Sequence, residues 1–500
     1  MKKTYLAFDL GAESGRAILG CLDAGRLEMT ELHRFANRPL GLPDGLHWNL
    51  LNLWGNLLDG LSKAVRHCGD NGMTLASVGA DTWGVDFGLL GRSGQLLGLP
   101  FAYRDTRNPA AMAKALAAIP REELFDITGS HFHAFNTLFQ LVAWRDAEPQ
   151  VLAQADKLLF MPDLLHYFLC GHARVESTSA STSQMVDPRV GSTGRWAADI
   201  LRRLDLPTQM LGAIGEPASV LGRLLPHVRE HTGAGDIRVI TPAGHDTASA
   251  VAAVPASGAD GWAFLSSGTW SLMGVELPHP VISARALAGN FTNERCLDGR
   301  IRLLRNIPGL WLVQQVRADL PSSDNPRDYA HLAEHAGLAV PFRTLVDPWH
   351  EPFGVAGGML AKMQRFATRT GQRVPQMLGE FVRCCLESLA MEYRRTLEMI
   401  EELAGRRVEV IHVVGGGGRN ALLNRMLCDA TNRPVIVGPF EATAAGNILA
   451  QAMGDGELAT PADVRQVIRA SGDLTMLQPS APQAWDDQYA RYLRVIGARS

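Results

Sequence analysis

Thr241-Pro242-Ala243-Gly244-His245-Asp246-Thr247-Ala248-Ser249-Ala250 lies almost at the midpoint of the chain. Proline and glycine end the apolar run 236–240, and Asp246 then opens a run of small helix-forming residues. The pattern predicts a strand, a tight turn and a helix that starts at a carboxylate. On either side, a short strand runs into a glycine turn, at Phe8–Gly11 and at Leu265–Gly268. We therefore expect two similar halves with a cleft at their junction.

Length and composition indicate a globular protein of more than one domain. A chain of 500 residues exceeds what one hydrophobic core usually serves, and 46% apolar with 20% charged residues is typical of globular proteins. The net charge of -3 gives no attraction to nucleic acid or to an anionic membrane, so we expect neither as a partner. The sequence contains no apolar run of about 20 residues and no signal-peptide core, which predicts a cytoplasmic protein.

The seven cysteines are odd in number and lack C-x-x-C spacing, so we expect reduced thiols. The adjacent pair Cys384-Cys385 has two interpretations, a redox device or, as its helical setting favours, buried apolar packing. Metal-binding motifs such as H-E-x-x-H are absent from the sequence. Any metal would therefore be Mg²⁺ bound by carboxylates.

Strand and helix patterns alternate along the chain, which predicts an α/β protein with ligands near strand ends. The expected strands are 4–9, 16–22, 27–35, 75–80, 262–266, 270–275, 408–414 and 434–437, and the expected helices are 49–67, 112–120, 374–402 and 441–453. The hydroxyl-rich segment Glu176–Gln184 predicts a loop, either solvated or facing a ligand.

Asp9-Leu10-Gly11-Ala12-Glu13-Ser14-Gly15-Arg16 places an acid at a strand end, before a glycine turn. Backbone N–H groups of such a turn can hold phosphate, Arg16 can add charge-assisted hydrogen bonds, and Asp9 can hold hydrated Mg²⁺. The alternative is a plain hairpin. The turn is neither a Walker A motif nor a Rossmann fingerprint, and its G-x-x-S-G order is not that of a serine hydrolase.

Two further segments carry chemistry. Gly415–Gly418 stands at an expected strand-to-helix junction, where four residues without Cβ let a base or a phosphate approach the backbone closely. Asp246 is either a helix N-cap or a general base that accepts the proton of a bound hydroxyl. Together with two glycine turns, one in each half, this carboxylate indicates a phosphoryl-transfer site.

These segments resemble the FGGY carbohydrate kinases, which have the ribonuclease H-like, actin-type ATPase fold. The resemblance runs from residue 4 to about residue 450, and it is carried by the Asp9–Arg16 turn, by Asp246 in its Gly-His-Asp-Thr setting, by the late glycine run and by segments 81–87, 102–107, 135–140, 265–274 and 306–312. It implies an N-terminal domain, 1–250, for sugar and phosphate and a C-terminal domain, 251–500, for the nucleotide. The members most similar to this sequence phosphorylate the 1-hydroxyl of L-rhamnulose with ATP, in L-rhamnose catabolism.

By that resemblance, Asp246 is the catalytic base and also a sugar contact. The implied ATP-binding residues are Ala12, Glu13, Ser14, Gly15, Arg16, Thr269, Gln314 and Gly417. The implied sugar-binding residues are Gly84, His245, Thr247 and Asn306. Glu13 departs from the small hydroxyl residue frequent in the family, and a carboxylate beside phosphates is acceptable only where it faces Mg²⁺ or solvent.

Other functions fit part of the same pattern. The nearest is a kinase of this fold for L-fuculose, xylulose or another polyol. An actin-like or chaperone-type ATPase would share the nucleotide site but leaves the Gly-His-Asp-Thr segment unexplained, and a catalytically inactive sugar sensor conflicts with the presence of both Asp9 and Asp246. The sequence does not predict an oligomeric state.

Overall fold

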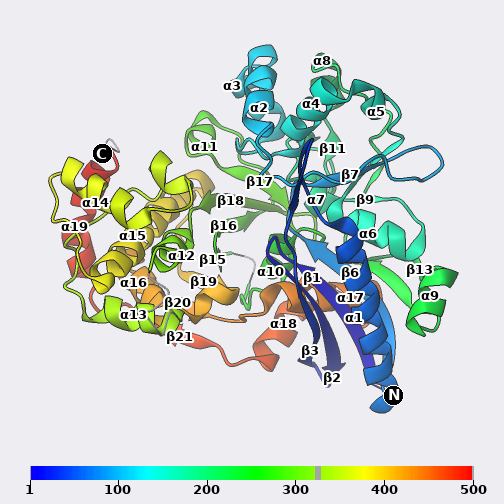
Figure 1. Ribbon diagram of the computed structural model, residues 1–500. Coiled ribbons are helices and arrows are strands. Elements are labelled where there is room, and N and C mark those ends of the chain that lie inside the picture. Colours follow the sequence, from blue (N-terminus) through cyan, green and yellow to red (C-terminus); the bar gives the residue numbers. More distant parts are fainter. Residues whose placement is uncertain (1, 259, 321–327, 498–500) are drawn as a thin grey trace. The chain divides into compact units, whose positions relative to one another are not determined.

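The computed structural model of the protein describes residues 2–258, 260–320 and 328–497, and Figure 1 shows its elements. The chain forms two compact units. The first contains residues 1–255, 276–303 and 442–472, and the second contains 256–275, 304–441 and 473–500. Each unit is therefore assembled from separate segments, whereas the sequence predicts one boundary near residue 250. The described residues include no helix with the length and apolar character of a membrane span.

The first unit is built on a six-stranded sheet in the order β13-β14-β6-β1-β2-β3. β1 pairs antiparallel with β2 and parallel with β6, which pairs parallel with β14. The strands are β1 (Lys3–Leu10), β2 (Ser14–Asp23), β3 (Arg26–Ala36), β6 (Thr74–Thr82), β13 (Ser219–Arg223) and β14 (Arg238–Thr241). The expected N-terminal meander and the strand at 75–80 are confirmed.

Helices cover both faces of this sheet. A Cβ at Gly60 of α1 (Leu50–Asp70) would lie 2.8 Å from Ala17, and one at Gly20 would lie 2.7 Å from Ile448 of α17 (Ala442–Gly454). Successive side chains of a strand point to opposite faces, so residues 17 and 20 of β2 face α1 and α17 respectively. In Figure 1, α17 lies beside β1 and β6 although hundreds of residues separate them in the chain.

α10 (Asp246–Ala252) packs closely on α17. A Cβ at Gly446 would lie 2.6 Å from the carbonyl carbon of Ser249, so only glycine fits there. Small residues continue the contact, with Ala248, Ala252 and Ala450 in one buried cluster. The run of small residues after Asp246 therefore allows two helix backbones to approach.

The remaining elements of the first unit surround this layer. They are β4 (Leu40–Leu42), β5 (Gly45–His47), β7 (Phe87–Leu90), α2 (Asn108–Ala118), α3 (Arg121–Thr128), α4 (Thr137–Ala147), α5 (Pro149–Ala153), β8 (Lys157–Phe160), α6 (Met161–Cys170), β9 (Val175–Glu176), α7 (Ser177–Ala180), β10 (Val186–Asp187), β11 (Arg195–Trp196), α8 (Ala198–Arg203), β12 (Ile214–Gly215), α9 (Pro226–Thr232), α11 (Ala284–Ala288), β17 (Thr292–Arg295) and α18 (Pro461–Ser471).

The second unit repeats the strand order of the first, as β18-β16-β15-β19-β20-β21. β15 pairs antiparallel with β16 and parallel with β19, which pairs parallel with β20. The strands are β15 (Trp262–Ser267), β16 (Ser271–Leu277), β18 (Ile301–Ile307), β19 (Val410–Val414), β20 (Val435–Val437) and β21 (Thr475–Leu477), and the chain passes between units within β16 and within β18. The expected duplication of halves is thus present in the two sheets.

Helices of the second unit include α15, the longest in the chain. Its predicted start near residue 374 is wrong by one turn, because Met377 takes the N-cap position and is exposed instead of packing on the apolar face. The helices are α12 (Trp311–Ala318), α13 (Tyr329–Leu338), η1 (Glu351–Gly354), α14 (Met359–Arg369), α15 (Leu378–Ala404), η2 (Gly416–Arg419), α16 (Ala421–Thr431) and α19 (Pro482–Val495).

All seven cysteines are free. Cys384 and Cys385 are both buried in α15, and burial raises the pKa of the Cys385 thiol to about 12. A thiol with so high a pKa is a poor nucleophile, so the pair packs as apolar side chains.

Candidate active site

Three carboxylates gather at strand ends in the first unit. Asp9 of β1 and Asp81 of β6 are neighbours in the parallel register. The next residue, Thr82, donates its backbone N–H to Gly244 O at 2.9 Å and forms a bridge with His245, directly before Asp246. Burial and then the charge of Asp9 raise the pKa of Asp81 well above its ordinary value, and the charge of Asp246 adds to this effect. The predicted base and the predicted Mg²⁺ ligand therefore lie in one electrostatic environment.

Asp246 is the first residue of α10, and its carboxylate is held through one oxygen. Its Oδ1 accepts the backbone N–H of Thr247 at 2.5 Å and the Thr247 hydroxyl at 3.1 Å. The N-cap position belongs to His245, so the alternative interpretation of Asp246 as the N-cap is wrong. The side chain of Asp246 is 32% exposed. It is therefore fixed in orientation and open to a ligand.

Gly84 lies beside the His245 ring. A Cβ at Gly84 would be 3.2 Å from His245 Nε2 and 3.3 Å from Thr182, which is tighter than ordinary van der Waals contact. Glycine at this position thus keeps space next to the imidazole. The structure brings together Gly84, His245, Asp246 and Thr247, four of the five residues predicted to bind the sugar.

The hydroxyl-rich segment Glu176–Gln184 is buried, so the solvated-loop interpretation is wrong. The carboxylate of Glu176 accepts hydrogen bonds from Thr178 N, Ser179 N and Gly244 N, at 2.6, 3.2 and 3.0 Å. Thr178 Oγ1 in turn accepts the backbone N–H of His245 at 3.1 Å. The buried Glu176 carboxylate thus holds the start of the segment, and the segment supports the backbone in front of Asp246.

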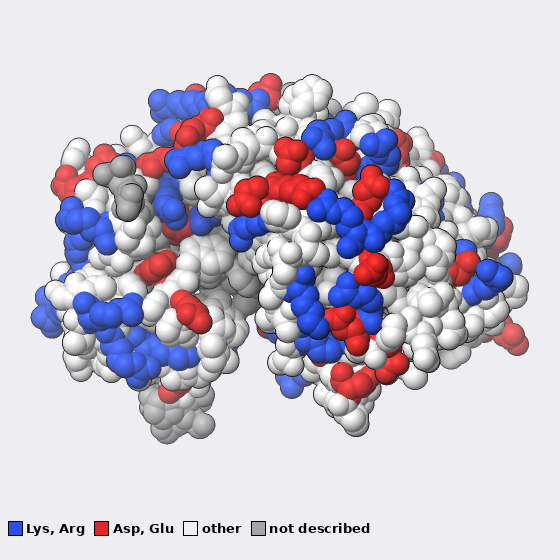
Figure 2. All heavy atoms as spheres, turned by 90° about the horizontal axis from the view of Figure 1, so that it is seen from above, with Lys and Arg blue, Asp and Glu red and all other residues white. Residues whose placement is uncertain are grey.

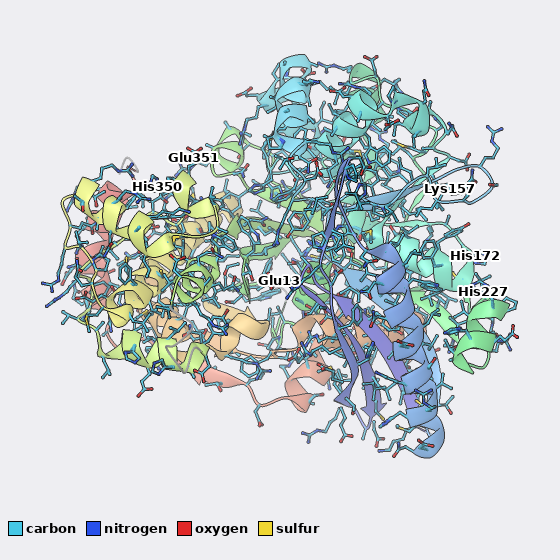
Figure 3. All side chains as sticks on the ribbon, viewed as in Figure 1. Glu13, Lys157, His172, His227, His350 and Glu351 are labelled. Carbon is cyan, nitrogen blue, oxygen red and sulfur yellow. The ribbon has the colours of Figure 1, made fainter. Side chains whose placement is uncertain are left out.

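Of the five predicted phosphate-binding residues, Ala12 and Glu13 lie in the turn between β1 and β2, and Ser14, Gly15 and Arg16 are the first residues of β2. Gly11 N donates to Ser14 O at 2.9 Å, and Asn37 closes the loop from outside by donating Nδ2 to Gly11 O at 2.8 Å. A Cβ at Gly15 would lie 2.6 Å from Phe35 Cε2, so a larger residue at this position would have to displace the Phe35 ring. Arg16 forms an ion pair with Asp9. Glu13 is exposed at the turn (Figure 3), which is the solvent-facing placement that a carboxylate near phosphates requires.

A buried carboxylate of the 81–87 segment, to which the sequence assigned no individual role, holds two tryptophans near Gly84. Asp86 accepts the indole N–H groups of Trp48 and Trp83 at 2.6 and 2.9 Å, the Gln140 amide at 2.7 Å and the Tyr103 backbone N–H at 3.0 Å. The two indole rings lie 4.0 Å apart. Burial raises the pKa of Asp86 to about 6, although the four hydrogen bonds act in the opposite direction.

In the second unit, three predicted nucleotide-binding residues lie close together: Thr269 between β15 and β16, Gln314 on α12 and Gly417 in η2. Gln314 of α12 donates its amide to Thr269 Oγ1 at 2.8 Å, and the Leu310 backbone N–H donates to Gly268 O at 2.9 Å. A Cβ at Gly417 would lie 2.7 Å from the carbonyl carbon of Ser267. Thr269, Gln314 and Gly417 thus surround the turn between β15 and β16.

The glycine run differs from its prediction in one respect. Gly416–Arg419 forms a 3-10 turn, and α16 begins only afterwards, with Asn420 accepting the Leu423 N–H at 3.0 Å. The helix N-terminus is therefore capped by the protein's own side chain and does not lie at the glycines. Asn306, the fifth predicted sugar residue, lies on β18 and belongs to the second unit, whereas the other four belong to the first.

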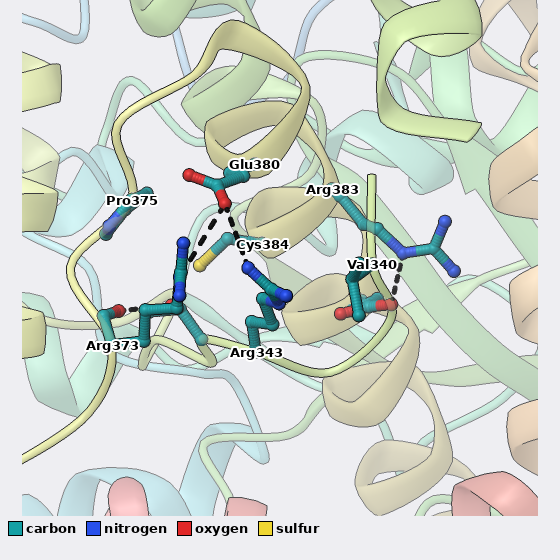
Figure 4. A pocket seen from close by; sticks show the side chains of 9 residues that line it. Val340, Arg343, Arg373, Pro375, Glu380, Arg383 and Cys384 are labelled. Carbon is teal, nitrogen blue, oxygen red and sulfur yellow. Dashed lines mark hydrogen bonds and ion pairs between the residues drawn. The ribbon is translucent and has the colours of Figure 1, made fainter. Parts of the chain in front are cut away.

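A small pocket at the start of α15 contains none of the predicted site residues. Arg343 and Arg373 lie 3.6 and 3.8 Å from Glu380, and Arg383 pairs with Glu387 at 2.7 Å (Figure 4). Lys and Arg are interspersed with Asp and Glu over the face shown in Figure 2, as the small net charge leads one to expect. Within the described ranges, no three His, Cys, Asp or Glu side chains form a metal-binding cluster.

Some residues at the candidate site of the first unit were not predicted from the sequence, because the patterns around them are weak. Asp81 ends a buried strand before a glycine, in the same way as Asp9, and this repetition could have marked it. Glu294 and Arg302, which contact His245, stand on β17 and β18 more than 45 residues further along the chain. No local pattern connects them to His245.

Comparison with known proteins agrees with this arrangement. The family models described as the N-terminal and C-terminal domains of the FGGY family of carbohydrate kinases match residues 4–253 and 263–454. A rhamnulokinase of Bacteroides thetaiotaomicron is 43% identical over 99% of this chain and 100% of its own length. Rhamnulokinases of Oceanobacillus iheyensis and Bacillus subtilis are 37% and 35% identical, each over 95% of this chain and over 98% and 95% of their own lengths.

Solved structures of low sequence identity share the fold. A xylulose kinase of Lactobacillus acidophilus superposes with a TM-score of 0.80 at 13% identity, over 99% of this chain and 98% of that one. A glycerol kinase of Plasmodium falciparum gives 0.77 at 15% identity, over 99% and 97%. The predicted two-domain kinase fold is confirmed.

Proposed function

From the premise that this chain belongs to the FGGY family of carbohydrate kinases, we propose that it transfers the γ-phosphoryl group of ATP to the 1-hydroxyl of L-rhamnulose. The products are L-rhamnulose 1-phosphate and ADP, in L-rhamnose catabolism. Near full-length identity with rhamnulokinases supports the choice of sugar. The observation that carries the chemistry is the Asp246 carboxylate, held through Oδ1 at the start of a helix.

Asp246 acts as the general base in this proposal. Two donors engage Oδ1, which orients Oδ2 toward an incoming hydroxyl. The sugar hydroxyl loses its proton to Asp246 as its oxygen bonds to the γ-phosphorus, and the bond from that phosphorus to the ADP oxygen breaks. Gly84, His245 and Thr247 hold the sugar, together with Asn306.

Two sets of residues hold ATP in this proposal. The backbone N–H groups of the 12–16 turn and the Arg16 guanidinium bind phosphate oxygens. Thr269, Gln314 and Gly417 bind the rest of the nucleotide, and the missing Cβ of Gly417 lets its turn pack against Ser267. A cytoplasmic location and the absence of nucleic-acid and membrane partners stay predictions from the sequence.

Asp9 and Asp81 fit a magnesium ion. They are register neighbours that offer oxygen ligands, and Asp81 Oδ1 is enclosed without a hydrogen-bond partner among the described residues. Mg²⁺ typically takes one or two carboxylates and completes its shell with water and substrate phosphates. When bound there, the ion would neutralise charge on the phosphates.

The test is ADP release measured with a panel of acceptors, namely L-rhamnulose, L-fuculose, D-xylulose and glycerol. We expect the highest kcat/KM with L-rhamnulose and little ADP without sugar. A higher kcat/KM with another acceptor would show that this acceptor is the substrate, and the protein would still be a kinase. ADP release that no sugar accelerates would instead indicate an ATPase.

A further inference from the structure

The His245 ring has charged groups at both of its nitrogens. Nδ1 lies 3.3 Å from Arg302 Nη2 and 3.4 Å from the Glu294 carboxylate, and Nε2 lies 3.4 Å from Asp246 Oδ1. His131 is a further titratable neighbour, but burial lowers its pKa to about 4, so it is neutral near pH 7. The charges that face His245 are therefore those of Arg302, Glu294 and Asp246.

Arg302 and Glu294 form a buried ion pair behind the ring. Arg302 Nη2 donates to Glu294 Oε2 at 3.0 Å, and the two side chains are 0% and 3% exposed. Arg302 Nε also donates to Arg295 O at 3.1 Å, which fixes the guanidinium against its own hairpin.

Stability alone does not account for such a pair. Desolvating two charges offsets much of their attraction, so a buried ion pair is weak evidence for stabilisation. This pair is instead directed at a histidine that adjoins the proposed base. Since Arg302 can only donate, the hydrogen bond to Nδ1 requires a lone pair on that nitrogen.

A neutral imidazole with a lone pair on Nδ1 carries its proton on Nε2. Nε2–H then points a donor at Asp246 Oδ1, the oxygen that also accepts the N–H and hydroxyl of Thr247. The opposite tautomer would set a lone pair against a carboxylate, which is unfavourable. The Glu294 carboxylate, 3.4 Å from Nδ1, favours a proton there, but its Oε2 already accepts the Arg302 guanidinium at 3.0 Å. The contacts of Arg302 and Asp246 therefore favour the tautomer with the proton on Nε2.

We propose that Arg302 and Glu294 are positioning residues for the phosphoryl-transfer reaction: Glu294 holds Arg302, Arg302 sets the tautomer of His245, and His245 Nε2–H orients the Asp246 carboxylate. Oδ1 then carries three donors, and Oδ2 receives the proton of the sugar hydroxyl. This proposal rests on the proposed function, because it gives Asp246 the role of base.

The direct test is the tautomer of His245 in the wild-type protein. Long-range ¹H–¹⁵N spectra of protein labelled with ¹⁵N-histidine report which ring nitrogen carries the proton, and the spectrum of His245→Gln assigns the signals. We expect a proton on Nε2 and none on Nδ1 at pH 7.5. A proton on Nδ1, alone or in addition, overturns the proposal.

The functional test removes the pair while keeping the buried charge balanced, in Arg302→Gln/Glu294→Gln. We expect kcat with the best acceptor to fall on the order of 10- to 100-fold, since misorientation of a reacting group is costly, with KM for ATP within about twofold. The matched control is Arg465→Gln/Glu276→Gln, which removes another buried arginine–glutamate pair of the first unit, 2.6 Å apart. It should lose similar stability and keep the wild-type kcat.

Equal kcat in the Arg302/Glu294 variant and the control would overturn the positioning role. Failure of the proposed function would appear differently, as wild-type protein that releases no ADP in response to sugar. The spectra require neither sugar nor ATP, so they test the tautomer even in that case.

Discussion

The side-chain amide of Asn447 donates a 2.6 Å hydrogen bond to the carboxylate of Asp81. The two residues are 366 positions apart, and the contact ties α17 to the end of β6 at the candidate active site. Asn447 Oδ1 also accepts the Gln451 amide at 2.7 Å, and Gln451 bonds to Leu6 O on β1. A late helix thus supports the strand ends that carry Asp9 and Asp81.

Replacing Asn447 by alanine should therefore destabilise the first unit. The change leaves the buried Asp81 oxygen and the Gln451 amide without this partner, which costs on the order of 2–3 kcal/mol in the free energy of unfolding. Urea denaturation measures the effect. The exposed Gln483→Ala on α19 is the control and should change stability by less than about 0.5 kcal/mol. A loss no larger than that of the control would contradict the supporting role.

Replacing Asp246 by asparagine should abolish most phosphoryl transfer. An amide cannot accept the hydroxyl proton, so we expect kcat to fall by about two to four orders of magnitude, with little change in ATP affinity. Coupled ADP release and nucleotide titration measure the two quantities. Asp236→Asn, which changes an exposed acid paired with Arg223, is the control. Wild-type turnover in Asp246→Asn would show that another group takes the proton.

Two adjacent glycines should respond differently to alanine. At Gly417 a Cβ would collide with the backbone of Ser267, whereas at Gly416 it would meet no described atom within 4 Å. We expect Gly417→Ala to raise KM for ATP about tenfold or more, because the turn must move away from β15. Gly416→Ala should stay within about twofold of wild type. Similar KM values for ATP in the two variants would show that close packing against Ser267 is not the reason why residue 417 is a glycine.

Asp86 should report its protonation through the neighbouring tryptophans. Its pKa of about 6 means that the carboxyl becomes protonated as the pH falls through 6, and both indole N–H groups, which donate to the same oxygen, then lose a charged acceptor. We expect the tryptophan emission of the wild-type protein to change with a midpoint near pH 6. The Asp86→Asn variant should lack this transition. A transition that persists in the variant would belong to another group.

Whether a feature of the fold or of the candidate site could be predicted from the sequence depends on whether that feature is local. The strands, the turn after Asp9 and the helix start at Asp246 are local patterns of punctuation and periodicity, and the structure confirms them. The hydroxyl-rich segment was ambiguous because its own first residue, Glu176, is buried and accepts hydrogen bonds from hydroxyl and backbone groups that composition alone assigns to solvent.

Non-local features were not predictable in the same way. The return of α17 to the first unit depends on packing such as Gly446 against Ser249, and the sequence shows only that both residues are small. The Arg302–Glu294 pair behind His245 depends on strand pairing, which brings residues from β17 and β18 to a loop before α10. From sequence alone, a charged residue on a strand is predicted to be exposed, and only the fold shows that it is buried.

The pocket at the start of α15 gives a prediction about stability and pH. Glu387 is buried beside Arg383, and burial raises its pKa to about 7, against an ordinary value of 4.5. Because the folded state binds this proton more tightly than the unfolded state, the contribution to stability is complete below pH 4.5 and is lost as the pH rises through 7. The whole change is at most about 3 kcal/mol.

Replacing Glu387 by glutamine, which does not titrate, should therefore flatten the dependence of the free energy of unfolding on pH between 4.5 and 7. Urea denaturation at several pH values measures this slope. The partly exposed Glu398→Gln, on the same helix and also paired with an arginine, should leave the slope as in wild type. An unchanged slope in Glu387→Gln would mean that the carboxyl is already ionised at low pH, held so by Arg383 and by the Phe342 N–H that donates to it at 2.9 Å.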